Sequence, residues 1–278
     1  MASTIGGRKY GVAKGVTLHG VCVLDCAGSG TYDDIIEGMD WVTQQHVSNP
    51  EQKLVANMSR GGDFSSSINA AVERMVVAGI VVAVAAGNDN GDACSKSPAS
   101  AVSAITVAAT DKYDRRASFS NFGTCVDIFA PGVQIFGAWY TCDTCTATLS
   151  GTSMASPHVA GVAALFLQNR SGSPKEILAA MLAKAVNGIV TDFKSSPNEY
   201  LQTTTASGGA PKTTYSPTAS PQADKYYHDR SPRYSTVEYT YLSHIFASLT
   251  TTCLCHICIN NNNASVLVNR VYFDILYN

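Results

Sequence analysis

The stretch Ile80-Val-Val-Ala-Val-Ala85 is apolar throughout and follows Gly79. A short run of this kind, rich in β-branched residues, is typical of a strand that is buried on both faces of a parallel sheet. Apolar residues at helical spacing over 65–77 come directly before it, and a strand-like run over 54–58 precedes that helix. Strand and helix in alternation predict an α/β domain.

The same alternation continues on both sides of this stretch. Residues 19–24 form another short β-prone run, and residues 31–46 follow with apolar residues on one helical face. After Asn88 the helical pattern is interrupted. Turn signals there separate four short strand candidates, at 104–109, 116–119, 126–130 and 133–138.

Two predicted helices close the domain. The first covers 153–168, with Pro157 in its first turn, and the second covers 174–185. Ser173 is placed to cap the second helix, because its hydroxyl can accept a hydrogen bond from the first free N–H groups. Pro174 suits the first turn, where a missing N–H costs nothing.

Composition and charge exclude some classes of partner. The 278 residues are 45% hydrophobic and 14% charged, and 19 Lys and Arg stand against 21 Asp and Glu, for a net charge of -2. A chain with this balance is not expected to bind nucleic acid through bulk charge.

The longest apolar-rich stretch, around 76–86, is shorter than the roughly 20 helical residues that cross a bilayer, so no membrane span is expected. Residues 1–14 lack the continuous apolar run of a secretory signal.

The composition changes near residue 203. From 203 to 236 the sequence is dominated by small and polar residues with four prolines, which is typical of a linker. We therefore predict a domain over 1–202, a linker over 203–236 and a tail of unknown structure over 237–278. The apolar end of the tail, from 264 to 277, could pair as a strand.

Nine cysteines are present, so at least one is unpaired if the others form disulfides. Neither of the two closely spaced cysteine groups has a second Cys or His pair at zinc-finger distance, so we interpret both as structural or accidental. Zinc binding by the second group stays an alternative. The two groups are Cys142 with Cys145, and Cys253, Cys255 and His256 with Cys258.

The stretch Leu149-Ser-Gly-Thr-Ser153-Met-Ala-Ser-Pro-His-Val-Ala-Gly161 places a serine at the start of an apolar helix. Free N–H groups and the dipole at a helix N-terminus favour developing negative charge, which suits a nucleophile. The alternative is that Ser153 is only a helix cap.

Asn88 follows the buried strand at the carboxyl end of the sheet, where α/β folds build their sites. It could offer a side-chain N–H to an oxyanion, or it could be a turn residue.

Together these residues resemble the subtilisin-like serine proteases, or subtilases, and most closely their proteinase K branch. The resemblance covers residues 5 to about 190 in the family's order, and its most specific parts are 151–155 and 157–161. It implies a subtilisin-like three-layer α/β fold with a mostly parallel central sheet. The other matching stretches are 10–14, 23–25, 28–30, 35–40, 65–67, 82–88, 97–100, 113–116 and 119–121.

The resemblance implies a serine endopeptidase that cleaves polypeptides through an acyl-enzyme. In such an enzyme Ser153 would be the nucleophile and Asn88 the oxyanion-hole donor. Two segments would flank the specificity pocket and hydrogen-bond an extended substrate. They are Ser59, Arg60 and Gly61 in one strand, and Ala85, Ala86 and Gly87 in the other.

Arg60 departs from the family, which usually has leucine at this position. It brings a cation into the substrate groove. We therefore expect a preference for an acidic side chain on the non-prime side of the substrate.

The family's two other catalytic residues have no counterpart here. They are an Asp in an early Asp-Ser/Thr-Gly strand and a His in His-Gly-Thr-His, and neither motif occurs. Residues 1–7 resemble those that follow the histidine motif, so we expect a truncated chain that lacks the N-terminal edge of the fold. Such a chain should be inactive, because a serine nucleophile requires an adjacent base. The alternative is a non-catalytic, peptide-binding pseudoprotease.

Three histidines of the domain do not replace the missing base. His158 lies in the same predicted helix as Ser153 and points to a different face. His19 and His46 have no flanking motif of the family.

The resemblance also implies a structural calcium ion. It would be held by the backbone carbonyls of Val102 and Ala104 and by the carboxylate of Asp127, with waters completing the shell. The alternative is that Asp127 only ends a strand. We further expect a monomer, and a full-length family form that is secreted or works in a lytic compartment.

Overall fold

The computed structural model describes residues 1–25, 29–203 and 273–277. By contacts the chain divides into a unit of residues 1–205 with 255–278 and a unit of residues 206–254. The second unit, most of the predicted linker and the group from Cys253 to Cys258 lie outside the described residues. The predicted boundary at residue 202 stays a prediction.

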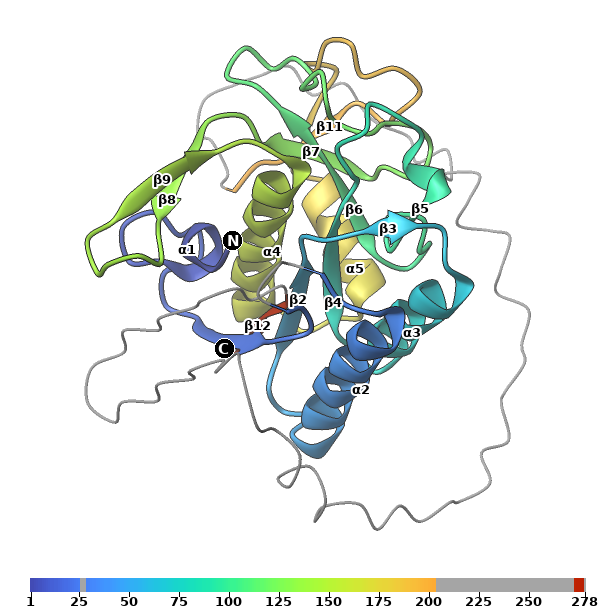
Figure 1. Cartoon of the computed structure of the whole chain (residues 1–278), viewed down its shortest axis with the longest axis vertical. Coiled ribbons are helices and arrows are strands. Elements are labelled where there is room, and N and C mark those ends of the chain that lie inside the picture. The colour runs from blue at the N-terminus through green and yellow to red at the C-terminus, as the bar shows by residue number, and fades with distance from the viewer. Residues whose placement is uncertain (26–28, 204–272, 278) are drawn as a thin grey trace. The chain divides into compact units, whose positions relative to one another are not determined.

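An eight-stranded sheet forms the centre of the described part, and Figure 1 shows helices on both of its faces. In spatial order its strands are β1 (Thr17–Val21), β12 (Phe273–Tyr277), β2 (Leu54–Met58), β4 (Val81–Ala85), β6 (Ile105–Thr110), β7 (Ile128–Pro131), β11 (Glu199–Tyr200) and β10 (Val186–Asn187). The neighbouring strands β2, β4, β6 and β7 run parallel, as predicted for an α/β domain.

The predicted buried strand is β4, and all five of its residues are buried. Val81 and Ala83 pack in a core cluster with Val159 of the helix that starts beside the predicted nucleophile. Val82 and Val84 pack in a second cluster on the opposite face. A strand alternates its side chains between two faces, so covering both faces requires the uninterrupted apolar run seen in the sequence.

Helices supply the two outer layers of the fold. On one face lie α1 (Ala2–Gly6), α4 (Thr152–Asn169) and α5 (Pro174–Leu182), and on the other lie α2 (Tyr32–Ser48) and α3 (Ser66–Val77) (Figure 1). Side chains cap the N-termini of three of these helices. Thr31 and Ser173 form capping boxes with Asp34 and Glu176, and the Ser65 hydroxyl accepts from the Ile68 N–H.

Among the four short strands expected after Asn88, the one at 116–119 is wrong. Arg116 makes only an isolated bridge to Thr110, and a turn follows it. The buried guanidinium of Arg116 donates to the carbonyls of Ala117 and Ser120, which draws this segment into a turn around it. The other three candidates correspond to β6, β7 and β8 (Ile135–Ala138).

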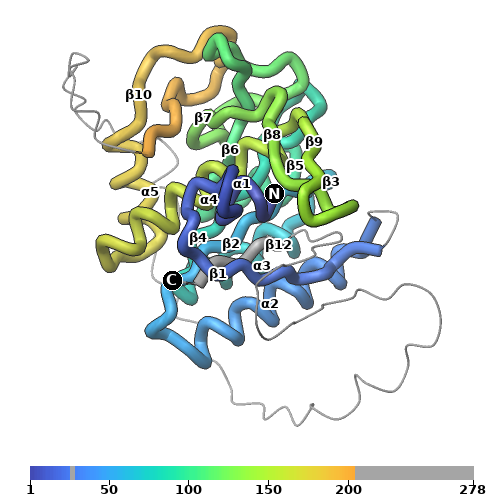
Figure 2. Tube along the Cα trace, turned by 90° about the vertical axis from the view of Figure 1, so that its left-hand side faces the viewer, coloured from blue at the N-terminus to red at the C-terminus, as the bar shows by residue number. Residues whose placement is uncertain are grey.

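A hairpin of β8 and β9 (Thr146–Leu149) leads into the helix α4. Figure 2 shows it next to α1. The Ala138 N–H donates to Ser3 Oγ of α1 at 2.9 Å. In the turn that follows α1, the ring of Tyr10 meets that of Phe136 edge to face, with centroids 5.2 Å apart. The strand β9 was not predicted, because its four residues are mostly exposed and carry no buried apolar run.

The C-terminal strand β12 lies between β1 and β2 and runs antiparallel to both. Each of its five residues has a partner on both sides, from Phe273 to Tyr277. The prediction that the apolar end of the tail pairs as a strand is confirmed. Within the described residues, β1 joins the sheet only through this strand.

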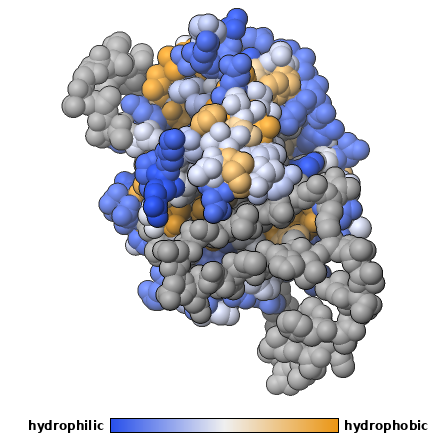
Figure 3. All heavy atoms as spheres, turned by 60° about the vertical axis from the view of Figure 1, so that its left-hand side comes forward, coloured by the Kyte–Doolittle hydropathy of each residue, from blue (hydrophilic) through white to orange (hydrophobic). Residues whose placement is uncertain are grey.

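The surface mixes polar and apolar side chains. On the face shown in Figure 3, apolar residues are interspersed with hydrophilic ones. Within the described ranges, no helix is both long and apolar enough to span a lipid bilayer.

Candidate active site

Ser153 lies in the first turn of α4, directly beyond the end of β2. Its hydroxyl donates a hydrogen bond to the backbone carbonyl of Ser59, with an Oγ–O distance of 2.8 Å. The Ser59 hydroxyl in turn donates to the backbone carbonyl of Ser153 at 3.1 Å. The two residues thereby join the carboxyl end of a central strand to the N-terminus of a helix.

Asn88 follows β4 and contacts the same helix N-terminus. Its Oδ1 accepts hydrogen bonds from the Thr152 N–H at 2.8 Å and from the Thr152 hydroxyl at 3.0 Å. These two bonds orient the amide, so that Nδ2 points away from Thr152. In the part of the chain that the structure describes, Nδ2 donates no hydrogen bond and is available as an oxyanion donor.

A buried polar network supports the pair of serines. Asn57, on β2, is fully buried and donates from Nδ2 to the Ser59 hydroxyl at 2.9 Å. The hydroxyl of Ser156, one turn into α4, donates to the Oδ1 of Asn57. We did not single out Asn57 or Ser156 from the sequence. The available signal was an asparagine inside the otherwise apolar run 54–58, since a buried amide requires hydrogen-bond partners.

The segment Ala85–Gly87, the second predicted substrate-binding strand, is held by Asn121. The Asn121 N–H donates to the Gly87 carbonyl at 3.0 Å, and its side chain donates to the Ala86 carbonyl at 2.9 Å. Gly87 has a φ of +105°, and a Cβ there would lie 2.3 Å from Nδ2 of Asn121. Only glycine fits this position without strain.

None of the described histidines bonds to Ser153. The Nδ1 of His158 pairs with the Met154 carbonyl at 2.8 Å, within the same helix. Burial lowers the pKa of His158 and that of His19, so each favours the neutral form. His46 is buried near the end of α2. Three further histidines lie outside the described residues, at 228, 244 and 256.

The predicted calcium site contains one carboxylate, that of Asp127, which is partly buried. Burial raises the pKa of Asp127 to about 7, although the Thr106 N–H donates to its Oδ2 at 2.7 Å. The Ser103 hydroxyl, between the two predicted carbonyl ligands, is buried and has no hydrogen-bond partner among the described residues. A bound cation would stabilise the ionised form of such a carboxylate, so this position is compatible with a cation site. Its oxygen donors are hard ligands, which calcium prefers.

The cysteines form two disulfides in the described part of the chain, Cys94–Cys125 and Cys142–Cys145. The structural interpretation of Cys142 and Cys145 is confirmed. The described residues contain no group of three or more His, Cys, Asp or Glu side chains that could hold a metal ion. The zinc alternative concerns Cys253–Cys258, which lies outside them.

The chain is similar to known proteins over most of its length. The sequence model described as "Subtilase family" matches residues 1–219. An "Extracellular serine proteinase" of Thermus sp. is 54% identical over 205 residues, which are 73% of this chain and 49% of that protein. An "Alkaline serine exoprotease A" of Vibrio alginolyticus is 50% identical over 206 residues, which are 74% of this chain and 38% of that protein.

A solved structure is similar over most of the described part. It is the crystal structure of a cold adapted subtilisin-like serine proteinase, with a TM-score of 0.70 and 48% identity, and the match covers 73% of each chain. The chain spans about half the length, or less, of the two curated relatives.

Proposed function

The chain belongs to the subtilase family of serine proteases, and on that premise we propose that it carries the nucleophile and the substrate-binding strands of a serine endopeptidase. The observation that supports this most is the placement of Ser153 at a helix N-terminus, beside Ser59 and Asn88. Nucleophile, substrate strand and oxyanion donor thereby meet at the carboxyl edge of a parallel sheet.

The proposed reaction is acyl transfer to water. Ser153 Oγ attacks the carbonyl carbon of a peptide bond, and its proton passes to a general base. The oxygen of the tetrahedral intermediate accepts hydrogen bonds from Asn88 Nδ2 and the Ser153 N–H. The intermediate collapses to an acyl-enzyme as the amine leaves with the proton from the base. Water then hydrolyses the ester and returns the proton to Ser153.

The proposed substrate is an extended polypeptide. Ser59, Arg60 and Gly61 would bind its backbone in the manner of an added strand, and Ala85–Gly87 would flank the specificity pocket on the other side. The N–H and carbonyl groups of Ala86 and Gly87 already bond to Val107, Thr152 and Asn121. These bonds support a role as a pocket wall, because they hold the segment in a single conformation before substrate binds.

We propose that the chain does not turn over substrate by itself. The Ser153 hydroxyl donates to a backbone carbonyl, which cannot take up its proton, and no described histidine contacts it. In subtilisin, loss of the catalytic serine or histidine alone lowers kcat by about 10⁶-fold. Without a base the site would bind peptides and cleave them too slowly to detect. The same observation favours the second candidate function, a peptide-binding protein of this family without turnover.

Labelling with a fluorophosphonate probe tests the proposal and separates the two candidates. We expect no labelling of the chain alone. After fusion to an upstream segment that carries the family's Asp and His motifs, the probe should label Ser153 and peptide hydrolysis should appear. Ser153→Ala should abolish both.

Two outcomes contradict the proposal. If the fused form hydrolyses peptides equally well with Ser153→Ala, the nucleophile is assigned wrongly. If the chain alone cleaves peptides in a Ser153-dependent manner, a base is already present. The first histidines to substitute would then be His19 and His46, followed by His228, His244 and His256.

We also propose a calcium ion at Asp127, bound with the carbonyls of Val102 and Ala104, where it would supply structural stability. The raised pKa of Asp127, caused by its partial burial, and the Ser103 hydroxyl, which has no hydrogen-bond partner among the described residues, support this site. We further propose that the family form works outside the cell. The two disulfides support this location, because such bonds persist in oxidising compartments. That the protein is a monomer stays a prediction.

A further inference from the structure

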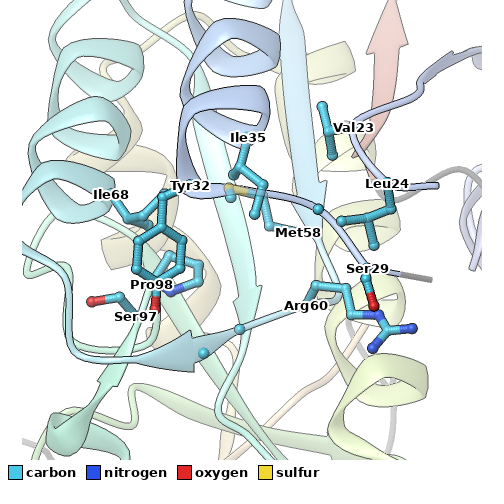
Figure 4. A pocket seen from close by; sticks show the side chains of 13 residues that line it. Val23, Leu24, Ser29, Tyr32, Ile35, Met58, Arg60, Ile68, Ser97 and Pro98 are labelled. Carbon is cyan, nitrogen blue, oxygen red and sulfur yellow. The ribbon is translucent and has the colours of Figure 1, made fainter. Parts of the chain in front are cut away.

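A cavity of about 250 Å³ lies beside the segment Ser59–Gly61, which follows β2 and is the proposed substrate-binding segment. Figure 4 shows side chains from β2, α2, α3 and the segment after β1 converging on it. The walls are largely apolar, and they include Val23, Leu24, Ile35, Met58 and Ile68.

The cavity is linked to Ser153 through the segment Ser59–Gly61. Ser59 accepts the hydrogen bond of Ser153 Oγ, and the next two residues, Arg60 and Gly61, line the cavity. An extended peptide advances by about 3.3 Å per residue. Consider a polypeptide that lies along the segment Ser59–Gly61 with the bond to be cleaved at Ser153. A side chain a few residues from that bond then reaches the cavity.

Arg60 is the charged residue among those that line the cavity. It is exposed, and its guanidinium extends past Ser29 in Figure 4. A guanidinium has five N–H donors, so it can bind a ligand carboxylate in addition to its other contacts. The formal charge among the residues that line this cavity is therefore positive, and their apolar walls favour methylene groups.

Two carboxylates lie nearby and have local roles. Asp25 and Asp34 line an adjoining hollow. Asp25 accepts from the Ser29 N–H at 2.9 Å, and Asp34 accepts from the Thr31 hydroxyl at 2.7 Å. Asp34 belongs to the capping box of α2, where its negative charge is favourable beside the N–H groups of that helix N-terminus.

We propose that this cavity binds a glutamate side chain of the polypeptide, with its methylenes on the apolar wall and its carboxylate on Arg60. The inference rests on the proposed function, because it requires a peptide along the strand beside Ser153. Glutamine has the same shape without the charge, and lysine has the opposite charge. A binding preference in the order Glu, Gln, Lys is the specific consequence.

The test uses the chain as it exists and needs no turnover. Fluorescent decapeptides of neutral sequence carry one Glu, moved along successive positions, and matched sets carry Gln or Lys there. Fluorescence anisotropy gives each Kd. At one position we expect Glu to bind about 3- to 10-fold more tightly than Gln, the size of a partly exposed charge-assisted hydrogen bond. Lys should bind more weakly than Gln.

Three variants assign the effect to Arg60. Arg60→Leu should bind the Glu and Gln peptides equally, and Arg60→Glu should reverse the order of Glu and Lys. Arg170→Leu is the matched control, because Arg170 is also exposed and lies beyond the far end of the 18-residue helix α4. It should keep the wild-type preference. Melting temperatures of all variants confirm that each is folded.

Equal binding of the Glu and Gln peptides at every position would overturn the inference, and so would a Glu preference that survives in Arg60→Leu. Absence of binding by all peptides would overturn it as well. The proposed function is decided separately, by labelling of Ser153 in the fused form, so the two proposals can fail independently.

Discussion

Ser153 and Ser59 bind each other through two reciprocal hydrogen bonds, from the Ser153 hydroxyl to the Ser59 carbonyl at 2.8 Å and from the Ser59 hydroxyl to the Ser153 carbonyl at 3.1 Å. The first bond points the hydroxyl of Ser153, the proposed nucleophile, at the proposed substrate-binding segment. A general base would have to compete with the Ser59 carbonyl for the same proton. The second bond connects the helix to Asn57, through the hydroxyl of Ser59.

Ser59→Ala should therefore destabilise the protein. It removes the bond to the Ser153 carbonyl and takes one acceptor from the buried Asn57 amide, a loss of about 1–3 kcal/mol in the free energy of unfolding. Urea denaturation measures it. Ser171→Ala, at an exposed serine, is the control. Equal stability of the two variants would show that the network does not hold α4 to β2.

Gly87→Ala should be more costly than an ordinary Gly to Ala change. The positive φ and the approach of the new Cβ to Asn121 act together, and we expect a loss of more than about 2 kcal/mol. Gly188→Ala separates the two causes, because Gly188 has a φ of +77° with nothing within 4 Å of its Cβ position. Gly15→Ala, in open space, is the neutral control. If Gly87→Ala matches Gly188→Ala, crowding by Asn121 contributes nothing.

Asp127 should make stability depend on pH in a calcium-free buffer. Its folded pKa of about 7 lies above the ordinary value of 3.8, so the folded state binds the proton more tightly than the unfolded state. The contribution is fully present below about pH 4 and is lost as the pH rises to about 7, by at most about 4 kcal/mol. The difference between wild type and Asp127→Asn, measured by urea denaturation from pH 4 to pH 8, isolates this carboxyl. A difference that does not change with pH would contradict the prediction.

Calcium should reverse this loss if the proposed site exists. At pH 8 the ionised Asp127 can bind the cation, which stabilises the folded state by mass action. We expect calcium to raise the melting temperature of wild type and not that of Asp127→Asn. Magnesium, which prefers a smaller octahedral shell, is the control ion. A calcium response retained by Asp127→Asn would place the ion elsewhere.

Removal of β12 should weaken the whole sheet. Deleting residues 273–278 leaves β1 and the facing edge of β2 without their described partner. Ile275→Pro removes one backbone donor from the ladder and should itself cost about 1–3 kcal/mol. Deletion of Asn278 alone is the control. An unchanged melting temperature after both larger changes would show that the strand does not contribute to folding, and would favour the predicted domain end at residue 202.

The local pattern of residues was sufficient to predict the layers of the fold. The apolar run 80–85 corresponds to β4 because burial on both faces leaves no place for a polar side chain. Helical spacing likewise predicted α3, and the cap at Ser173 with Pro174 predicted the start of α5. Ser153 and Asn88 were singled out from their positions at a helix start and a strand end, and their catalytic roles stay predictions.

Contacts between segments far apart in the sequence were decided only by the tertiary structure. Periodicity reports which face of an element is buried, and it does not report what covers that face. The 116–119 prediction failed because the guanidinium of Arg116 bonds carbonyls within the same segment, and the bond from Ser156 to Asn57 joins residues 99 positions apart. The placement of β12 between β1 and β2 depends on backbone pairing across more than 200 residues, which the sequence of the strand itself does not encode.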